Sequence, residues 1–308
     1  MEPDSRDDRL RAAAFAYLDR LRARGGDSLS YRDLEAFEFE GRRVPLIGQT
    51  GIRKVRGVEA ALSIMTTFRA RPQNRPYDDE VGDDWYGRYK WRGTDPGQSD
   101  NVALRRALEL AKPLTWFVGV GPAMYTAIYP VWLVGEEPAD HEFVVALDEE
   151  MRQQWENARL FHPVDLALRR QYAQSVVRRR LHQPVFRQRV LIAYSSQCAL
   201  CRLRHSELLD AAHIKEDSEG GEPVVPNGVA MCAIHHRSFD ANVLTVRPDY
   251  QIEVRKDVRE EQDGPTLLHA LQGVHGEKLV LPKQRAAWPD QGLLEERYER
   301  FRAMGITS

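Results

Sequence analysis

The 308-residue chain has little cysteine and no long apolar run, and both scarcities exclude classes of protein. Three cysteines are an odd number and too few for a disulfide framework, which is dense in cysteine. No run of about 18 apolar residues exists, and the amino terminus is charged from the start, so we expect neither a membrane span nor a secretory signal. Internal repeats and low-complexity segments are also missing. These absences favour a cytoplasmic globular protein of two domains.

Charge is balanced over the whole chain but not along it. The formal net charge is -2, yet arginine far outnumbers acidic residues between positions 152 and 204. Such a basic stripe can hold a polyanion locally without making the whole protein basic. A solvated helix face explains the same stripe equally well.

The pattern of apolar residues divides the chain. Residues 5–24 place apolar side chains at helical spacing. From Gly51 to about Asp148, short apolar or alternating runs are cut by Gly, Pro and Asp, which is typical of a mainly β domain. Helical patterns follow, with breaks near Pro163 and Pro184. The sequence therefore predicts an α+β protein, with an amino-terminal domain over 1–150, a basic helical linker over 151–184 and a carboxy-terminal domain over 185–308.

All the cysteines lie in two short stretches, "CALC" from Cys198 and "CAIHH" from Cys232. Two thiolates at Cys-x-x-Cys spacing converge on one ion, and a second pair with the same spacing completes a tetrahedral zinc site. A redox pair is disfavoured because no strand leads directly into a helix of a thioredoxin-like unit. Two buried cysteines beside a surface histidine are the remaining alternative. We predict structural Zn²⁺ bound by Cys198, Cys201, Cys232 and His235.

A second group of polar residues lies between and just after the cysteine pairs. "LLDAAHI" predicts a strand that ends in His213, and a polar loop leads to Asn227. A short helix then carries His236 and Asp240. Residues four apart on a helix share a face, so these two side chains can grip one ion beyond the zinc site.

The stretches "CALC", "DAAHI", "PNGVAMC" and "CAIHHRSFD", which span about 198–240, together resemble the HNH or ββα-metal nucleases in their zinc-bound form. The resemblance implies that His213 is the general base and that Asn227 orients the loop bearing it. It also implies that His236, with Asp240, holds a catalytic divalent ion. The residue types suit Mg²⁺, Mn²⁺ or another transition metal.

One position departs from the family's pattern. Many members have histidine or aspartate just before the base, where this chain has Ala212. Asp210 lies on the same strand face by alternation and is our candidate for the missing ligand. If no ligand replaces it, the site binds metal weakly or is inactive. The resemblance also gives the basic stripe a purpose, because cations that precede a nuclease module can hold a DNA backbone; the candidates are Arg178, Arg179, Arg180 and Arg187.

The first domain also carries a looser likeness. "PYDDEVGDDWYGRYKWRGTDPGQSDNVALRRA" and "PLTWFVGVGPAMYTAIYPVWLVG" resemble the domains joined to this nuclease module in restriction endonucleases, and more distantly the SRA-type, PUA-like domains that read modified cytosine. The likeness implies a pocket for a flipped base, with aromatic rings and a carboxylate. Ordinary core packing explains the aromatic residues equally well, and Asp100 alternatively caps the helix that follows it. The candidates are Tyr77, Asp78, Trp91, Asp100, Tyr125, Tyr129 and Trp132.

Taken together, the resemblances imply a modification-dependent, type IV-like restriction endonuclease of bacterial defence. Its partner would be double-stranded DNA with modified cytosine, and a homodimer is expected because such modules usually nick one strand each. Two alternatives remain open. One is a sequence- or structure-directed HNH nuclease that does not flip bases. The other is a catalytically inactive, zinc-containing DNA-binding module.

Overall fold

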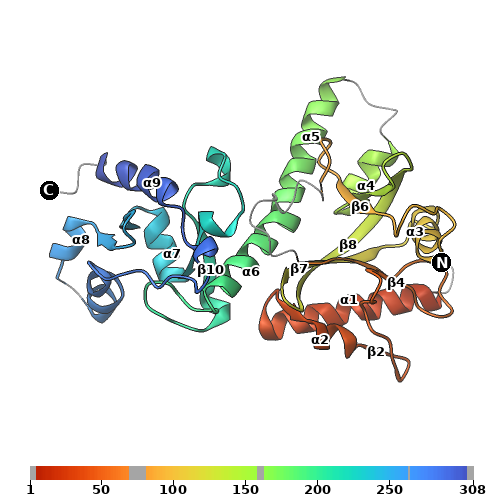
Figure 1. Ribbon diagram of the computed structural model, residues 1–308, viewed down its shortest axis with the longest axis horizontal. Coiled ribbons are helices and arrows are strands. Elements are labelled where there is room, and N and C mark those ends of the chain that lie inside the picture. The colour runs from red at the N-terminus through yellow and green to blue at the C-terminus, as the bar shows by residue number, and fades with distance from the viewer. Residues whose placement is uncertain (1–4, 69–80, 158–162, 263, 304–308) are drawn as a thin grey trace. The chain divides into compact units, whose positions relative to one another are not determined.

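The structure, a computed structural model, describes residues 5–68, 81–157, 163–262 and 264–303. The chain divides into two compact units, Met1–Val185 and Phe186–Ser308. Both units mix helices with mainly antiparallel strands, so the α+β class predicted from the sequence is confirmed (Figure 1). Within the described ranges, no helix combines the length and the apolar composition that crossing a bilayer requires.

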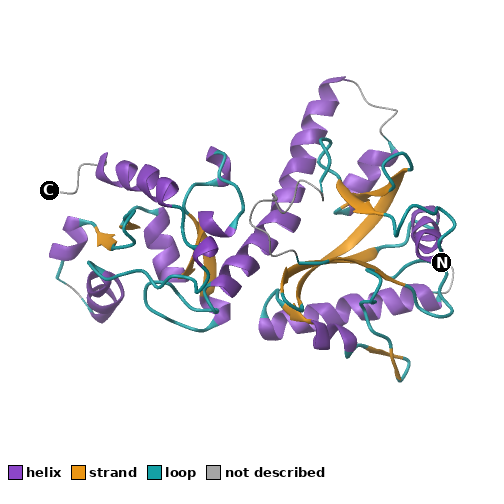
Figure 2. Ribbon diagram, viewed as in Figure 1, coloured by secondary structure: helices purple, strands orange, loops and turns teal. Residues whose placement is uncertain are grey.

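A curled sheet organises the first unit. In the described residues its strands follow the order β4-β5-β7-β8-β9-β6, with β1 beside β8. Only β5 and β7 of these run parallel. The register shifts within β7–β8 and β8–β9 bend the long strand β8, and Figure 2 shows the sheet curling. The strands are β1 Leu29–Ser30, β4 Ile52–Arg53, β5 Ser63–Thr66, β6 Gly87–Lys90, β7 Leu114–Gly121, β8 Met124–Glu137 and β9 Glu142–Ala146, and a separate hairpin joins β2 Glu38–Phe39 to β3 Arg42–Arg43.

Helix α1, Arg6–Gly25, packs against this sheet. It matches the helix predicted from the sequence over residues 5–24. The Ser5 hydroxyl accepts the N–H of Asp8 and so satisfies a free donor of the first turn. The apolar face of α1, including Leu10 and Leu18, shares a buried core with residues of β7 and β8. The other helices of the unit are α2 Tyr31–Glu35, α3 Ser99–Glu109, α4 Glu149–Glu156 and α5 Pro163–Val177.

The predicted break near Pro184 is a widened turn rather than an interruption. A π-helical turn, Arg178–His182, joins α5 directly to α6, Gln183–Ala193. Proline has no N–H to give to the carbonyl four residues earlier, and a π turn is one way for a helix to accommodate that loss. Tyr172 donates to Asp148 at 2.9 Å, and Arg180 donates to the carbonyls of Leu147 and Tyr129. The helices that the sequence assigns to a linker over 151–184 thus belong to the first unit.

The second unit is built around a small ββα arrangement. Strand β10, Leu209–His213, pairs with β11, Gly228–Cys232, and α7, Ala233–Asp240, follows at once. Residues of α6, both strands, α7 and α9 share one hydrophobic core, which includes Phe186, Val229, Phe239 and Leu294. The remaining strands and α helices are β12 Leu244–Val246, β13 Ile252–Val254, α8 Lys256–Glu260 and α9 Gln291–Ala303.

Candidate active site

The cysteines and His235 form a tight cluster. The ligand atoms of Cys198, Cys201, Cys232 and His235 all lie within 4.8 Å of one another. His235 Nδ1 is 3.2 Å from Cys232 Sγ and 3.4 Å from Cys198 Sγ. Three thiol sulfurs and one imidazole nitrogen at such distances form a donor set that fits a tetrahedral zinc ion.

The far nitrogen of His235 supports this donor set. Nε2 lies 2.7 Å from the carbonyl oxygen of Ala270, so it carries the proton of that hydrogen bond and leaves Nδ1 facing the sulfurs. Burial lowers the pKa of His235, but its contacts with Cys198 and Cys232 outweigh burial and raise the pKa to about 10. Metal binding must therefore displace a proton, as expected for a thiolate and imidazole site.

Strand pairing sets the positions of the next residues. Asp210 lies opposite Met231, and His213 lies opposite Gly228 at the end of β10. Alternation puts Asp210 and Ala212 on the same strand face, but the Ala212 side chain is fully buried whereas half of the Asp210 side chain is exposed. Asp210 can thus offer a carboxylate from the face where Ala212 has none.

The His213 side chain is partly buried and packs against an aromatic ring. Its ring stacks on Phe186, with centroids 4.1 Å apart and planes 18° from parallel. Burial lowers the pKa of His213, against the nearby charge of Asp217. Its Nε2 is buried and has no hydrogen-bond partner within the described ranges. At neutral pH the imidazole is therefore neutral, which is the form that can accept a proton.

Gly228 allows this stacking. A Cβ at that position would lie 2.5 Å from Val190 Cγ2 and 2.8 Å from Phe186 Cζ. Any larger residue would displace both of these core side chains, so glycine lets α6 approach β11 closely.

Asn227 closes the loop that follows His213. It is 1% exposed, and its side-chain oxygen accepts the N–H of Lys215 at 2.9 Å. Its amide nitrogen donates to the carbonyls of Lys215, at 3.0 Å, and Glu222, at 2.9 Å. One side chain thus ties the start of the loop to its end, in line with the orienting role expected for it.

His236 lies between two carboxylates. Its Nδ1 is 3.4 Å from Asp210 Oδ2, and its Nε2 is 3.5 Å from Asp240 Oδ2. The hydrogen bond with Asp210 raises the pKa of His236 against the effect of burial. Burial pushes the pKa of Asp210 upward, but the contacts with His236, the Ala211 N–H and Arg187 together lower it. An imidazole between two carboxylates is a donor set that fits Mg²⁺, Mn²⁺ or a later transition metal.

The structure brings Asp210, His236 and Asp240 together, but their ligand atoms do not all face a single position that one ion could occupy. The two carboxylates contact different ring nitrogens of His236. Across the described ranges, only the cysteine cluster has three or more ligand atoms that lie within 4.8 Å of one another. An ion held by Asp210, His236 and Asp240 together therefore requires one of these side chains to turn.

An open cleft of about 420 Å³ exposes this group. His213 does not line it, although the charges of His236, Asp210 and Asp240 act on its pKa and so lie near it. The lining residues are Arg187, Glu207, Leu208, Leu209, Asp210, Ala233, His236, Arg237 and Asp240.

Arg237 is a lining residue that the sequence reasoning missed. It is exposed and has no ion-pair partner in the part of the chain that the structure describes. The signal for it was its place directly after His236 on a short helix. An unpaired guanidinium in an open cleft suits a phosphate group.

The arginines of the basic stripe have different surroundings. Arg187 lies in the cleft, where its Nε is 3.2 Å from Asp210 Oδ1 and its Nη2 donates to the Leu209 carbonyl at 2.6 Å. Arg180 is half-buried and its guanidinium is engaged by two backbone carbonyls of the first unit. Arg179 is exposed and Arg178 is partly exposed.

The expected base-pocket residues are not all gathered in one place. Tyr77 and Asp78 lie outside the described residues. Tyr125 and Tyr129 are buried in the core against α1, and the Tyr129 hydroxyl donates to Asp19 at 2.7 Å. These two tyrosines therefore act as core residues rather than as walls of an open pocket.

Three members of that set lie elsewhere. Trp91 packs edge-on against His141, with ring centroids 5.1 Å apart. Asp100 is buried and pairs with Arg92 at 2.7 Å. Trp132 is partly exposed on β8. The N-cap of α3 is Gln98, so Asp100 is not the cap that the sequence offered as an alternative.

Comparison with known proteins bears on this second unit. The HNH endonuclease family model matches residues 198–247. That segment contains the cysteine cluster and all the candidate catalytic residues on β10, α7 and the loop between the strands. Residues 198–247 are thus an HNH endonuclease domain, and the protein is a nuclease.

Two solved structures are similar to the chain at low identity. One is a modification-dependent TagI restriction endonuclease, at 14% identity over 82% of this chain and 85% of that one, with a TM-score of 0.30. The other is the type IV phosphorothioation-dependent restriction endonuclease ScoMcrA, at 17% identity over 59% of this chain and 50% of that one, with a TM-score of 0.23. A search of curated proteins found no match. TM-scores this low do not establish a shared overall fold.

Proposed function

We propose that the protein is a metal-dependent endonuclease that hydrolyses phosphodiester bonds of double-stranded DNA in the cytoplasm. One observation carries the proposal. Within the matched nuclease segment, the neutral imidazole of His213 has a buried nitrogen without a hydrogen-bond partner in the described ranges. It lies near His236, which sits between two carboxylates at the edge of an open cleft. Phosphodiester hydrolysis needs a base for water and a cation beside the phosphate, and this arrangement offers sites for both.

Each candidate site residue of the second unit has a role in this proposal. His213 removes a proton from the attacking water, and Asn227 holds the loop that follows the base. Asp210, His236 and Asp240 hold a divalent ion, Mg²⁺, Mn²⁺ or another transition metal, which when bound offsets the charge that builds on the phosphate. Arg187 holds Asp210 in place through its Nε contact.

Structural zinc and the basic stripe complete this proposal. Cys198, Cys201, Cys232 and His235 would hold structural Zn²⁺, which would fix the start of α7, and His236 follows directly on that helix. The exposed Arg179 and its neighbour Arg178 contact the DNA backbone, where each cation releases bound counterions. Arg180 contributes to the first unit's packing through its two carbonyl partners.

A finer proposal concerns selectivity. We propose that the first unit restricts cutting to DNA that carries modified cytosine, and that two copies of the chain act together to cut both strands. The sequence likeness of the first unit supports this. One structural observation is compatible with it: Trp91 Nε1 is buried and has no hydrogen-bond partner within the described ranges. An unsatisfied buried donor is costly, and a bound ligand can relieve that cost.

The test is plasmid cleavage with Mg²⁺ or Mn²⁺ on unmodified, 5-methylcytosine, 5-hydroxymethylcytosine and phosphorothioate DNA. His213→Ala is the control. We expect cutting of a cytosine-modified substrate, abolished in the variant. Equal cutting of all substrates would keep the nuclease and remove the modification sensor. DNA binding without cutting would instead favour a zinc-containing binding module, because Ala212 leaves one ligand position apolar.

A further inference from the structure

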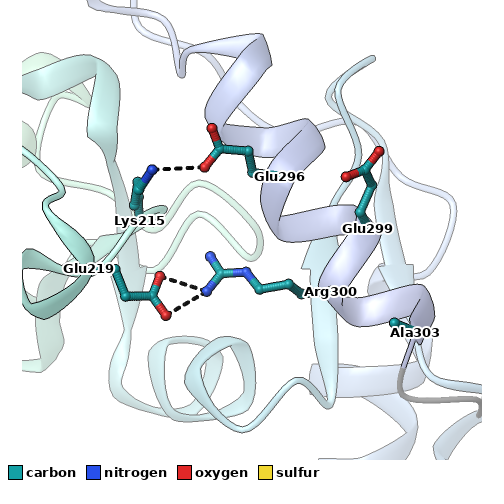
Figure 3. A pocket seen from close by; sticks show the side chains of 6 residues that line it. All are labelled: Lys215, Glu219, Glu296, Glu299, Arg300 and Ala303. Carbon is teal, nitrogen blue, oxygen red and sulfur yellow. Dashed lines mark hydrogen bonds and ion pairs between the residues drawn. The ribbon is translucent and has the colours of Figure 1, made fainter.

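Helix α9 is fastened to the loop that follows His213. Glu296 pairs with Lys215 at 3.0 Å, and Arg300 contacts both carboxylate oxygens of Glu219, at 2.7 and 2.6 Å. Figure 3 shows these side chains reaching across from the helix to the loop. These side chains are partly exposed, so water screens the ion pairs and each pair contributes little stability on its own.

A third side chain of α9, Arg297, points inward and is only 5% exposed. Its Nη1 donates to the carbonyl of Ile214 at 3.2 Å, and its Nη2 donates to the carbonyl of Phe239 at 2.5 Å. The guanidinium carbon also lies 3.6 Å from the centroid of the Phe239 ring. One planar group thus joins the end of β10 to the end of α7.

Burying this cation has a cost that packing alone does not explain. The charges of Asp240, Glu216 and Glu219 favour the buried cation, but in the described part of the chain none of these carboxylates forms an ion pair with Arg297. Its Nε is buried without a hydrogen-bond partner. Its neighbours on the buried face of α9, Leu294 and Phe301, are apolar. An apolar side chain at this position would fill the space without desolvating a charge. A cation at the carboxyl end of α7 gains some compensation from the helix dipole.

The two carbonyls that Arg297 holds are next to the reaction site. Ile214 directly follows His213, and Phe239 directly precedes Asp240. We propose that Arg297 is a positioning residue of the nuclease site, because its guanidinium fixes the peptide after the base and the peptide before a metal ligand. This inference rests on the proposed function for the roles of His213 and Asp240. Lysine offers a single ammonium group and cannot reproduce the two-pronged geometry.

The test compares Arg297→Lys with Arg302→Lys, a matched control on the same helix whose guanidinium lies over Tyr298, 5.9 Å from its ring centroid. Mn²⁺ affinity is measured by electron paramagnetic resonance without DNA, and folding by circular dichroism and thermal unfolding. Steady-state cleavage then gives kcat and KM. We expect folded Arg297→Lys to bind Mn²⁺ about tenfold more weakly, in the range found when outer contacts of metal ligands are removed. We expect kcat of Arg297→Lys to fall while its KM for DNA stays unchanged. In the control variant, kcat, KM and Mn²⁺ affinity should all match the wild type.

Three results would overturn the inference. They are wild-type Mn²⁺ affinity together with wild-type kcat in Arg297→Lys, an equal loss in Arg302→Lys, and an Arg297→Lys protein that does not fold. The last result would assign the residue to stability alone. If the wild-type protein cuts no DNA, the proposed function fails, and the Mn²⁺ comparison still decides whether Arg297 shapes the ligand group.

Discussion

Replacing Gly228 by alanine tests whether the packing of α6 on β11 orients His213, the proposed base. The added Cβ would lie 2.5 Å from Val190 Cγ2 and 2.8 Å from Phe186 Cζ, well inside the roughly 3.5–4.0 Å of an ordinary carbon contact. Both neighbours are almost fully buried, so they have little room to move. Overpacking of this kind costs about 1–3 kcal/mol, and we expect that loss in the free energy of unfolding.

The variant should also slow the reaction, because the Phe186 ring that must shift is the one on which His213 stacks. A misplacement of about 1 Å at a reacting group can cost on the order of 100-fold in rate. Urea unfolding and cleavage under single-turnover conditions, corrected for the folded fraction, separate the two effects. Gly264→Ala is the control, since a Cβ there meets no atom within 4 Å. Full cleavage per folded molecule in Gly228→Ala would refute the link between this packing and the base.

Three further predictions address the zinc cluster, the base and the cleft. Cys232→Ala should lose bound zinc and unfold the second unit, seen as lost metal by atomic absorption and lost helical signal; a folded, zinc-loaded variant would contradict the assigned ligands. Burial lowers the pKa of His213 below its ordinary value of 6.5. With Mn²⁺ saturating at each pH, the cleavage rate should therefore stay level down to pH 6.5 and fall at lower pH. A fall that begins near pH 8 would exclude His213 as the titrating base. Arg237→Ala should weaken DNA binding uniformly across sequences and reduce the salt dependence by about one counterion, as measured by filter binding at several salt concentrations; an unchanged slope would show that Arg237 does not contact phosphate.

Short-range patterns in the sequence specify the candidate metal-ligating side chains. The Cys-x-x-Cys and Cys-x-x-His spacings place ligands within single turns, so the backbone alone brings each pair together before any tertiary packing is considered. The same holds for His236 and Asp240 on one helix face, and for Asp210 and Ala212 on one strand face. The amphipathic pattern over 5–24 is long enough to predict α1.

Tertiary structure decides which of these groups face one another and which aromatic residues are core. Phe186 meets His213 and Arg297 spans two carbonyls far along the chain, and no window of sequence records such contacts. Strand alternation could not separate a pocket wall from a core residue, because it reports a face but not what covers that face. In the structure α1 covers Tyr125 and Tyr129. Spacing therefore determined the candidate metal ligands, and the family resemblance named the candidate base. The packing of distant segments decided the surroundings that orient these side chains.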